Sequence, residues 1–488
     1  MLNCSRIPPE LTRNGMSQSG SGALSLLHGS TSTLEGTSGR LLGLHHAQSS
    51  IWRRLSRHHI AQVRLMHSEL GSRRPKQTST EPDASAMDAR GHDAKGLRTV
   101  TVHDQDGLSA HRQAWDLLAL QAPQRLPTYF PAWMEPIFRD GLGSDQRWFC
   151  SLAYMGERLV GVLPVILTPH PLLGSRWPLL QTTLGRYSPS GDIVLASDCA
   201  AAALRALLSE VSRQSPAHLG LDLKAVRRNS PVHAALQEGL DGYTVFRSAR
   251  AHCSFLNVEG DFDTYLAGLG SMRRNLKRFR KKLDGRGEVA VEVRKGADAG
   301  VDILADFLAL EAAGWKGRSG SAILHNTDLL TFYEAIVRNF AAQERLEWHL
   351  IRVSGRLVAA QMAFRCGTAL ILIKWAFDED FAECRLGTLL TKVTAQEAFS
   401  SPEIVELNTM SLSDGYDSWY VSQDEYVDLH LVRSALVPAL LHGSRIAMRA
   451  AYHAYVRPRI PPPVRNAWRR FKRRGDRKPR RAANVKAR

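Results

Sequence analysis

Two similar strand–turn–strand patterns, far apart along the chain, constrain its fold more than any other feature. The first runs RWFCSLAYM, turns at Gly156-Glu157 and continues RLVGVLPVIL; the second runs LEWHLIRV, turns at Ser354-Gly355 and continues RLVAAQMAFRC. Each has the turn chemistry of a β-hairpin, and each follows a helix-like aromatic stretch, YFPAWMEPIFR or TFYEAIVRNF. The same elements in the same order predict an internal duplication, with two lobes built on one plan.

The second copy shows the plan more clearly. Its predicted elements are, in order, a strand at 289–293, helices at 301–315 and 328–340, the strands EWHLIRV, RLVAAQMAFRC and ALILIKWAF, a helix at 387–399, and strands at 403–409 and 425–432. An antiparallel meander that leads through one crossover helix to a parallel strand gives a mixed sheet. We therefore expect an α/β fold (an α+β mixed sheet) in two tandem lobes.

The length of 488 residues is too great for a single hydrophobic core. The predicted divisions are a disordered or leader segment at 1–96, an N-terminal lobe at 97–250, a C-terminal lobe at 251–433 and a basic tail at 434–488. The leader is rich in Ser, Gly and Arg. It can be a disordered leader, a transit peptide, or translation from an upstream start with Met66 as the true beginning.

The positive charge is concentrated at one end of the chain. Of the formal net charge of +17, the sequence from Arg433 onward supplies 17 Lys and Arg minus one acid, Asp476, which is +16. This placement predicts a basic arm on a nearly neutral body. An amphipathic helix at 435–455, ended by prolines at 461–463, can dock on an anionic membrane surface; a disordered arm is the alternative.

The cysteine pattern argues against a disulfide scaffold and against a zinc site. The six cysteines contain no CxxC pair and no Cys/His pair at metal-ligand spacing, which fits a reducing compartment. No apolar run approaches the length needed to span a bilayer. We expect a cytoplasmic protein, with peripheral membrane contact as an alternative, no metal, and an oligomeric state that the sequence does not specify.

A candidate anion site lies where the strand ALILIKWAF gives way to the helix at 387–399. The segment RLGTLL supplies the five candidates Arg385, Leu386, Gly387, Thr388 and Leu389. A helix N-terminus offers unpaired N–H groups and the positive end of the dipole, a glycine permits close approach, and arginine adds a fixed charge. A plain turn is the alternative for a single glycine at such a junction.

Several stretches resemble the CelD/BcsL-type acetyltransferases of the GNAT superfamily, which are related to the FemABX transferases. They are MRRNLKRFRKKL, EAAGWKGRSGSAI, the RLGTLL segment, PTYFPAWM and GERLVGVLPV, and they span about 97 to 433. The sequence departs from the family pattern at Phe377, where a tyrosine is common, and at Arg385-Leu386, which replaces Ser-Pro. The usual Tyr-Lys pair is also missing from LSDGYDSWYVSQ.

The resemblance implies a GNAT-type acyltransferase that uses acetyl-CoA or another acyl-CoA. It implies an N- or O-linked acceptor, a small molecule or glycan precursor, tied to cellulose or exopolysaccharide biosynthesis at the cell envelope. One alternative is a FemABX-like transfer from aminoacyl-tRNA, the only case in which we expect nucleic acid as a partner. A non-catalytic scaffold on an anionic membrane is the other.

Acyl transfer requires a proton acceptor for the nucleophile and a proton donor for the leaving thiolate. Glu406 and Asp378 are the candidate bases, and Tyr416 and Tyr420 are the candidate acids. Each carboxylate can instead be an exposed charge at a strand end, and each tyrosine can cap a core.

The acceptor pocket has its own candidates. Glu311 and Trp315 are expected on one helix face, with Lys316 just beyond the helix end. Trp375, at the end of the strand before the anion site, is the fourth candidate. The alternative is that the tryptophan packs and the basic residues cap the helix. In MRRNLKRFRKKL, an apolar stripe predicts an amphipathic helix with a solvated basic face, and a surface for an anionic partner is the alternative.

Overall fold

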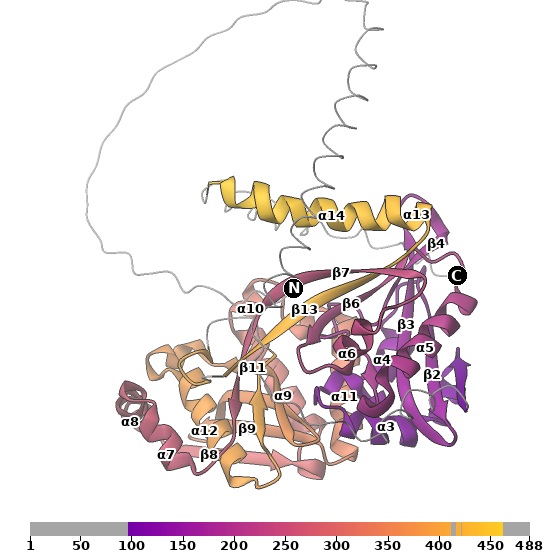
Figure 1. Ribbon diagram of the computed structural model, residues 1–488. Helices are drawn as coiled ribbons and strands as arrows, with labels where there is room; N and C mark the ends of the chain where they lie inside the picture. The colour runs from indigo at the N-terminus through magenta and orange to yellow at the C-terminus, as the bar shows by residue number, and fades with distance from the viewer. Residues whose placement is uncertain (1–95, 411–415, 421, 462–488) are drawn as a thin grey trace, which may run out of the picture. The chain divides into compact units, whose positions relative to one another are not determined.

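The computed structural model describes residues 96–410, 416–420 and 422–461. Their strands belong to one mixed sheet (Figure 1). The strands are β1 (Leu97–Val102), β2 (Arg147–Met155), β3 (Arg158–His170), β4 (Gly174–Gln181), β5 (Val194–Leu195), β6 (Gly220–Arg227), β7 (Tyr243–Asn257), β8 (Val289–Lys295), β9 (Leu346–Val353), β10 (Arg356–Cys366), β11 (Ala369–Phe377), β12 (Glu406–Asn408) and β13 (Ser422–Arg433).

Helices cover both faces of the sheet. In the N-terminal half they are α2 (Gln105–Ser109), α3 (Arg112–Gln121), α4 (Pro131–Asp140), α5 (Ala200–Gln214) and α6 (Pro231–Gln237). In the C-terminal half they are α7 (Phe262–Gly268), α8 (Ser271–Asp284), α9 (Val301–Ala313), α10 (Trp315–Arg318), α11 (Thr327–Ala342), α12 (Leu386–Ser400), α13 (Leu436–Pro438) and α14 (Ser444–Ala451).

The two halves repeat one order of elements. In each, a strand is followed by helices, a three-strand antiparallel meander, a crossover helix and a strand parallel to the last meander strand. The crossover pairs are β4 with β6 around α5, and β11 with β12 around α12. The mixed α/β fold and the tandem arrangement predicted from the repeated hairpins are confirmed.

The conformation of the turn residues explains why the hairpins could be predicted from the sequence. The first meander pair turns at Gly156, with φ of 59°, and the second turns at Ser354 and Gly355, with φ of 48° and 80°. These left-handed conformations match the twist of tight hairpin turns and favour glycine. Residues on alternate sides of β11 then enter separate cores: Ala369 and Ile371 face α9 and α11, whereas Leu370 and Leu372 face α8 and α12.

Two long strands join the halves. β13 pairs with β7 along its length and with β6 of the N-terminal half on its other side, so the sheet continues from one lobe into the other (Figure 1). β7 itself runs across the predicted lobe boundary at 250/251. The last strand predicted for the C-terminal lobe is thus hydrogen-bonded to both lobes.

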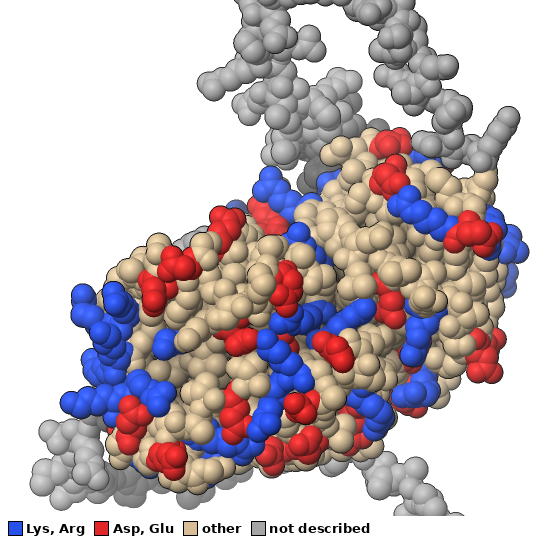
Figure 2. Space-filling view, turned by 90° about the horizontal axis from the view of Figure 1, so that it is seen from below, with Lys and Arg blue, Asp and Glu red and all other residues tan. Residues whose placement is uncertain are grey.

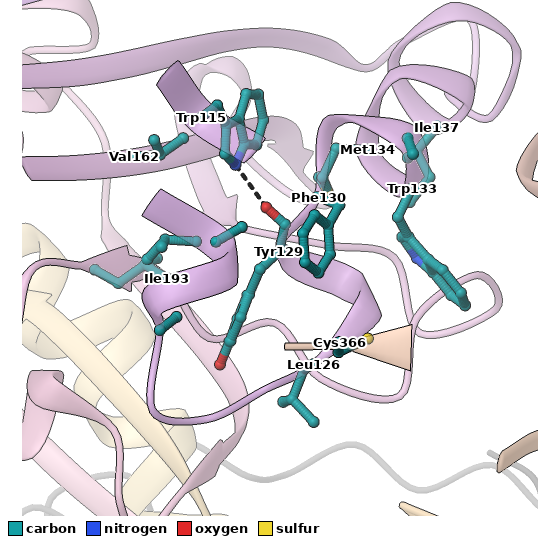
Figure 3. Close-up of a cluster of buried hydrophobic side chains, with 14 of the residues drawn as sticks. Trp115, Leu126, Tyr129, Phe130, Trp133, Met134, Ile137, Val162, Ile193 and Cys366 are labelled. Carbon is teal, nitrogen blue, oxygen red and sulfur yellow. Dashed lines mark hydrogen bonds between the residues drawn. The ribbon is translucent and has the colours of Figure 1, made fainter. Parts of the chain in front are cut away.

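An aromatic cluster closes the contact between the halves. The turn before α4 and α4 itself place Phe130 and Trp133 in the core with no exposed surface, beside the end of β10 (Figure 3). The Trp133 ring meets those of Phe332, Phe340 and Phe364 nearly edge-on, with centroids 5.4, 6.4 and 5.8 Å apart. Edge-to-face packing of this kind adds to the free energy gained by burying the rings. The PTYFPAWM stretch therefore forms the lobe interface.

The amphipathic helix predicted at MRRNLKRFRKKL is α8. Its apolar stripe packs toward α12, with Leu276 and Leu283 buried and Met272 and Phe279 partly so. Its seven basic residues are all exposed. Figure 2 shows basic side chains gathered at the left edge of the molecule, the side on which Figure 1 labels α8.

The helix predicted in the tail is present over 436–459. Alternating with α13 and α14 are two π-helical segments, η7 (Ala439–Gly443) and η8 (Tyr452–Val456), and a 3-10 turn, η9 (Arg457–Arg459), ends it before Pro461. The basic segment beyond it and the N-terminal leader lie outside the described residues. Across the described ranges, the helices all lack the combination of length and apolar character that would carry one through a membrane.

Candidate functional site

The sheet opens at the strand pair β11 and β12. Only the first three residues of β11 pair with β12, which ends after Asn408. β11 continues beside β10 as far as Phe377, and the register of this pair shifts opposite the Met362–Ala363 step. Beyond Ile371 this edge of β11 therefore has no partner strand among the described residues, and the bulge redirects the side chains just past that point.

The connection from β11 to α12 differs from the sequence prediction. The sequence suggested that strand and helix meet through a single glycine, but a 3-10 segment, η5 (Glu379–Cys384), lies between them. The sharp turn is made by Arg385, whose φ of 50° and ψ of 52° are left-handed. A residue other than glycine is uncommon in this region and indicates a constraint imposed by its surroundings. Gly387 lies instead within the first turn of α12.

Gly387 makes room for the indole of Trp375. A Cβ atom added at Gly387 would lie 3.0 Å from the Trp375 ring, which is tighter than ordinary contact. The same indole stacks on Phe377, with centroids 5.3 Å apart and planes within 16°. We expected a ligand to approach Gly387 closely. On the side where a side chain would project, that space is occupied by Trp375 of the protein itself.

The first turn of α12 nonetheless presents N–H groups. No side chain caps it: the N-cap residue, Arg385, makes no side-chain hydrogen bond there. The N–H groups of Thr388 and Leu389 turn back to the Arg385 carbonyl at 2.9 and 3.2 Å. The N–H groups of Leu386 and Gly387 come before that of Thr388, so they have no carbonyl within the helix to bond to. Their N–H groups and the helix dipole favour an anion at this end.

Basic side chains surround this helix start. Arg385 is exposed, and no ion pair is recorded for its guanidinium within the described part of the chain. Burial raises the pKa of the Cys384 thiol and the charge of Glu383 raises it further, while the nearby charges of Lys282, near the end of α8, and Arg286, just beyond it, oppose that rise. Arg286 also pairs with Glu383 at 3.1 Å. Arg385 therefore adds its positive charge at a helix start where Lys282 and Arg286 are partly offset by Glu383.

The corresponding helix of the N-terminal half is less suited to an anion. A connection of residues 182–199 leads from β4 to α5, and it ends beside the carboxylate of Asp198, which pairs with Arg158 at 2.8 Å. A carboxylate at that place repels a phosphate group. Within the residues that the structure describes, α12 is the crossover helix that begins with a cation for which no ion pair is seen.

Residues 270–407 match the family model of the acetyltransferase (GNAT) domain. This segment is a GNAT acetyltransferase domain. It runs from the start of α8 to β12 and contains the β11–α12 junction, so the anion-ready helix belongs to the matched region. The GNAT domain makes the chain an acyltransferase. No curated protein sequence matches the chain.

Solved structures align with this chain at low identity. The FemX crystal structure is 11% identical, with a TM-score of 0.48, and the match covers 70% of this chain and 99% of that chain. The C-terminal DUF2156 domain of a putative lysylphosphatidylglycerol synthetase from Agrobacterium fabrum is 10% identical (TM-score 0.43; 69% and 96% covered). A tandem GNAT protein from the clavulanic acid biosynthesis pathway is 13% identical (TM-score 0.39; 70% and 99% covered). Likenesses at these scores carry no argument about function.

One prediction for the acceptor pocket of the GNAT domain is wrong. Glu311 and Trp315 do not share a helix face, because α9 ends at Ala313 and the extended backbone of Gly314 separates it from α10. Trp315 is 46% exposed at the start of α10. Its indole is therefore available to an acceptor, whereas Glu311 is buried.

Glu311 and Lys316 are brought together instead. The Lys316 ammonium donates to one Glu311 oxygen at 2.7 Å, and the other oxygen accepts the N–H of Ile323 at 2.9 Å. Lys316 also reaches the carbonyl of Trp375 at 3.4 Å. This pair, with Glu311 buried and Lys316 partly buried, fixes the connection between α9 and α11 against the end of β11, and both side chains are engaged by partners within the protein.

The acidic residues before α12 also have structural partners. Asp378 caps η5 by accepting the N–H of Asp380 at 3.0 Å and forms an ion pair with Arg356. Glu379 accepts the N–H of Trp315 at 2.7 Å and pairs with Arg318. The predicted base Asp378 is thus a capping residue, and Glu379 ties α10 to the β11–α12 junction.

Glu406, the other predicted base, is held between basic groups. It is 5% exposed at the start of β12, and one of its oxygens lies 2.8 Å from Arg227 of β6 while the other lies 3.6 Å from Arg125. Asn408 donates to it at 2.9 Å, and Arg227 pairs in turn with Asp424 at 2.5 Å. The structure assigns Glu406 to the contact between the lobes.

The predicted acids lie on the connection that follows β12. Tyr416 and Tyr420 stack, with centroids 5.4 Å apart and planes within 8°. Tyr416 is half-buried, whereas burial raises the pKa of the Tyr420 phenol well above its usual value, with a further contribution from Tyr416. Because β11 and β12 are parallel, this connection begins at the edge of the sheet where β11 separates from β12.

Lys374 and Tyr333 were missed. The Lys374 ammonium lies over the ring of Tyr333, 5.5 Å from its centroid, just beyond the bulge in β11. Burial raises the pKa of Tyr333, and the charge of Glu311 raises it further. The available signal was the single lysine inside the apolar strand ALILIKWAF, since a charge in a buried strand needs a specific partner.

Proposed function

We propose that the GNAT domain binds acyl-coenzyme A with its phosphates at the first turn of α12 and transfers the acyl group to an amine or hydroxyl. The supporting observation is the uncapped helix start beside Arg385, at the point where β11 and β12 separate. A pyrophosphate needs N–H donors and fixed positive charge. The sequence match to a GNAT domain covers this place.

The protein's contribution to transfer is mainly positioning. Bound acyl-coenzyme A supplies a thioester carbonyl, and the strand edges freed by the separation of β11 and β12 can hold an extended thiol arm by backbone hydrogen bonds. We assign proton donation to the leaving thiolate to Tyr416, since its ring is half-buried and Tyr420 keeps it in place. The ion pairs of Glu406 and Asp378 argue against either as the base.

The acceptor that we propose is a glycan precursor, acetylated in envelope polysaccharide biosynthesis. The resemblance to CelD/BcsL-type acetyltransferases suggests it, and the exposed Trp315 supports it. An indole offers a flat apolar surface with one N–H donor, which suits a sugar ring. The Glu311–Lys316 pair and Trp375 would form the adjoining wall.

Calorimetric titration with acetyl-coenzyme A tests the phosphate site. Thr388→Asp places a carboxylate in the first turn of α12, which stabilises the helix but repels a phosphate, so binding should weaken roughly tenfold or more without loss of fold. Thr327→Asp makes the same change in the first turn of α11 and should leave binding unchanged. Unaltered binding in Thr388→Asp would refute the assignment.

A second candidate is transfer from aminoacyl-tRNA in the manner of the FemABX transferases. The exposed basic face of α8 favours it, since such a face can neutralise phosphates of RNA. Fluorescence anisotropy with charged tRNA decides between the two. Binding that falls when Lys277 and Lys281 are both changed to Glu supports the tRNA reading, and acetyl-coenzyme A binding without tRNA binding excludes it.

A further inference from the structure

Among the described residues of the C-terminal helix, the buried ones lie at its root. There, Pro438, His442, Gly443 and Ile446 are buried, and His442 meets Asp222 of β6, with Nε2 and Oδ1 3.2 Å apart. Gly220 gives this ring its space, since a Cβ there would lie 3.0 Å from the His442 Cδ2. From 447 to 459 every residue is exposed, and Figure 1 shows the helix in yellow continuing past its root.

An apolar stripe runs along this helix with a period of four. Leu436, Leu440, Met448, Tyr452 and Val456 are 75%, 61%, 66%, 44% and 49% exposed, and Ser444 takes the one polar position in this row. In a regular α-helix such a stripe would drift around the axis, because one turn holds about 3.6 residues. Here α-helical turns alternate with π-helical turns, which hold about 4.4, so the average is close to four and the stripe stays straight.

A basic stripe lies one residue further along. Arg445, Arg449, His453 and Arg457 repeat at the same spacing, and all are exposed. A step of one residue turns by about 100° around a helix, so the basic stripe flanks the apolar one. From Ser434 to Ile460 the sequence contains no acid.

We propose that the helix at 436–459 docks on the surface of an anionic lipid bilayer. Its apolar stripe would enter the interface while the flanking arginines meet lipid headgroups, which is the pattern of a helix lying in the membrane plane. Tyrosine suits that depth, with its ring in the apolar layer and its hydroxyl in water. The absence of acids fits a surface of uniform negative charge better than a protein partner of mixed charge.

Vesicle co-sedimentation of the full chain tests the proposal. Wild type should sediment with vesicles of phosphatidylcholine and phosphatidylglycerol and remain in solution with phosphatidylcholine alone. The double variant Met448→Gln/Tyr452→Gln should lose at least tenfold in partitioning, because it removes apolar surface without a change in charge. Ala450→Gln/Ala454→Gln makes matched changes at exposed positions off the stripe and should bind like wild type.

Three results would overturn the proposal. One is undiminished sedimentation of Met448→Gln/Tyr452→Gln, which would assign binding to the basic residues of the tail rather than to the apolar stripe of the helix. Another is equal binding to neutral vesicles. The third is a dimer of wild type in analytical ultracentrifugation that this variant dissociates, since the stripe would then be an interface between two copies. Acetyl-coenzyme A binding should be equal in all three proteins, so this test is independent of the proposed transfer reaction.

Discussion

His218 lies in the N-terminal half with no exposed surface. Its Nε2 is 2.8 Å from the Tyr243 hydroxyl, and its Nδ1 faces the Ser215 carbonyl. Burial lowers the pKa of this imidazole to about 4, although the bond to Ser215 opposes the shift; the charge of Arg433 adds to it. The ring is therefore neutral in the folded protein at pH values where a histidine in the unfolded chain is charged.

Stability should consequently fall as the pH falls from about 6.5 toward 4. Over that range the unfolded chain takes up a proton at His218 and the folded one does not, which lowers the free energy of unfolding by up to roughly 3 kcal/mol. Above pH 6.5 His218 is neutral in both states and no longer makes the free energy of unfolding depend on pH. Urea unfolding of wild type and His218→Gln at several pH values should show a shallower pH dependence in the variant. His325→Gln, at an exposed histidine, is the control and should keep the pH dependence of wild type. An equal pH dependence of the free energy of unfolding in wild type and His218→Gln would contradict this prediction.

Glu406 gives a second prediction at the scale of one residue. Glu406→Gln removes one of the two carboxylates that face the buried Arg227 guanidinium and the one that faces Arg125, so Arg227 keeps Asp424 but its buried charge is less well compensated. We expect a loss of about 3 kcal/mol in the free energy of unfolding, measured by urea denaturation. The turnover of the folded fraction should change little, and a collapse of turnover at full stability would restore Glu406 as a base. Glu403→Gln, which breaks a more exposed ion pair with Arg365, is the control and should cost less than 1 kcal/mol.

At the scale of elements, α4 stabilises the contact between the lobes. Trp133→Ala removes a fully buried ring from among three phenylalanines of the C-terminal half, and we expect a loss of about 3–5 kcal/mol in the free energy of unfolding. Trp315→Ala, at an exposed tryptophan, should cost little stability and act on the acceptor instead. Thermal unfolding of both variants checks this, and equal losses would be inconsistent with the packing.

The elements that the sequence predicted well are those set by local alternation. The strands RWFCSLAYM, RLVAAQMAFRC and ALILIKWAF have the predicted bounds, because pleated alternation and a two-residue turn define each of them. The end of α9 was missed for a tertiary reason. The predicted helix ran to Trp315, whereas α9 ends at Ala313 and the break falls at Gly314. The break brings Gly317 so close to Ala312 that a Cβ would lie 1.7 Å from its carbonyl oxygen.

The candidate site was predictable in its place but not in its contacts. The position of RLGTLL after a meander identified the helix start correctly. The sequence could not show that Arg385 takes the left-handed turn, or that Trp375 occupies the space beside Gly387. Nor could it show the ion pairs of Glu406, because the partners Arg227 and Arg125 are far away in sequence.

At the scale of the whole molecule, the lobes should not fold separately. A chain cut between α6 and β7 leaves 241–488 without α4 and without the β6 partner of β13, so an aromatic surface and a strand edge are exposed. We expect this fragment to aggregate alone and to become soluble when co-expressed with residues 92–240. Size-exclusion chromatography checks the outcome. A soluble monomeric fragment that binds acetyl-coenzyme A would show the lobes to be independent.

The shared ribbon of β7 and β13 has a mechanical consequence. Two enzyme lobes commonly close on a substrate by bending at a short linker, which must give up few hydrogen bonds. Here the crossing is made by paired strands along most of their length, so bending would break a ladder of hydrogen bonds. The molecule has no hinge at this crossing. Changes in the size of the opening must come from the connections that follow β11 and β12, and the range of acceptors should vary with the length of those two loops.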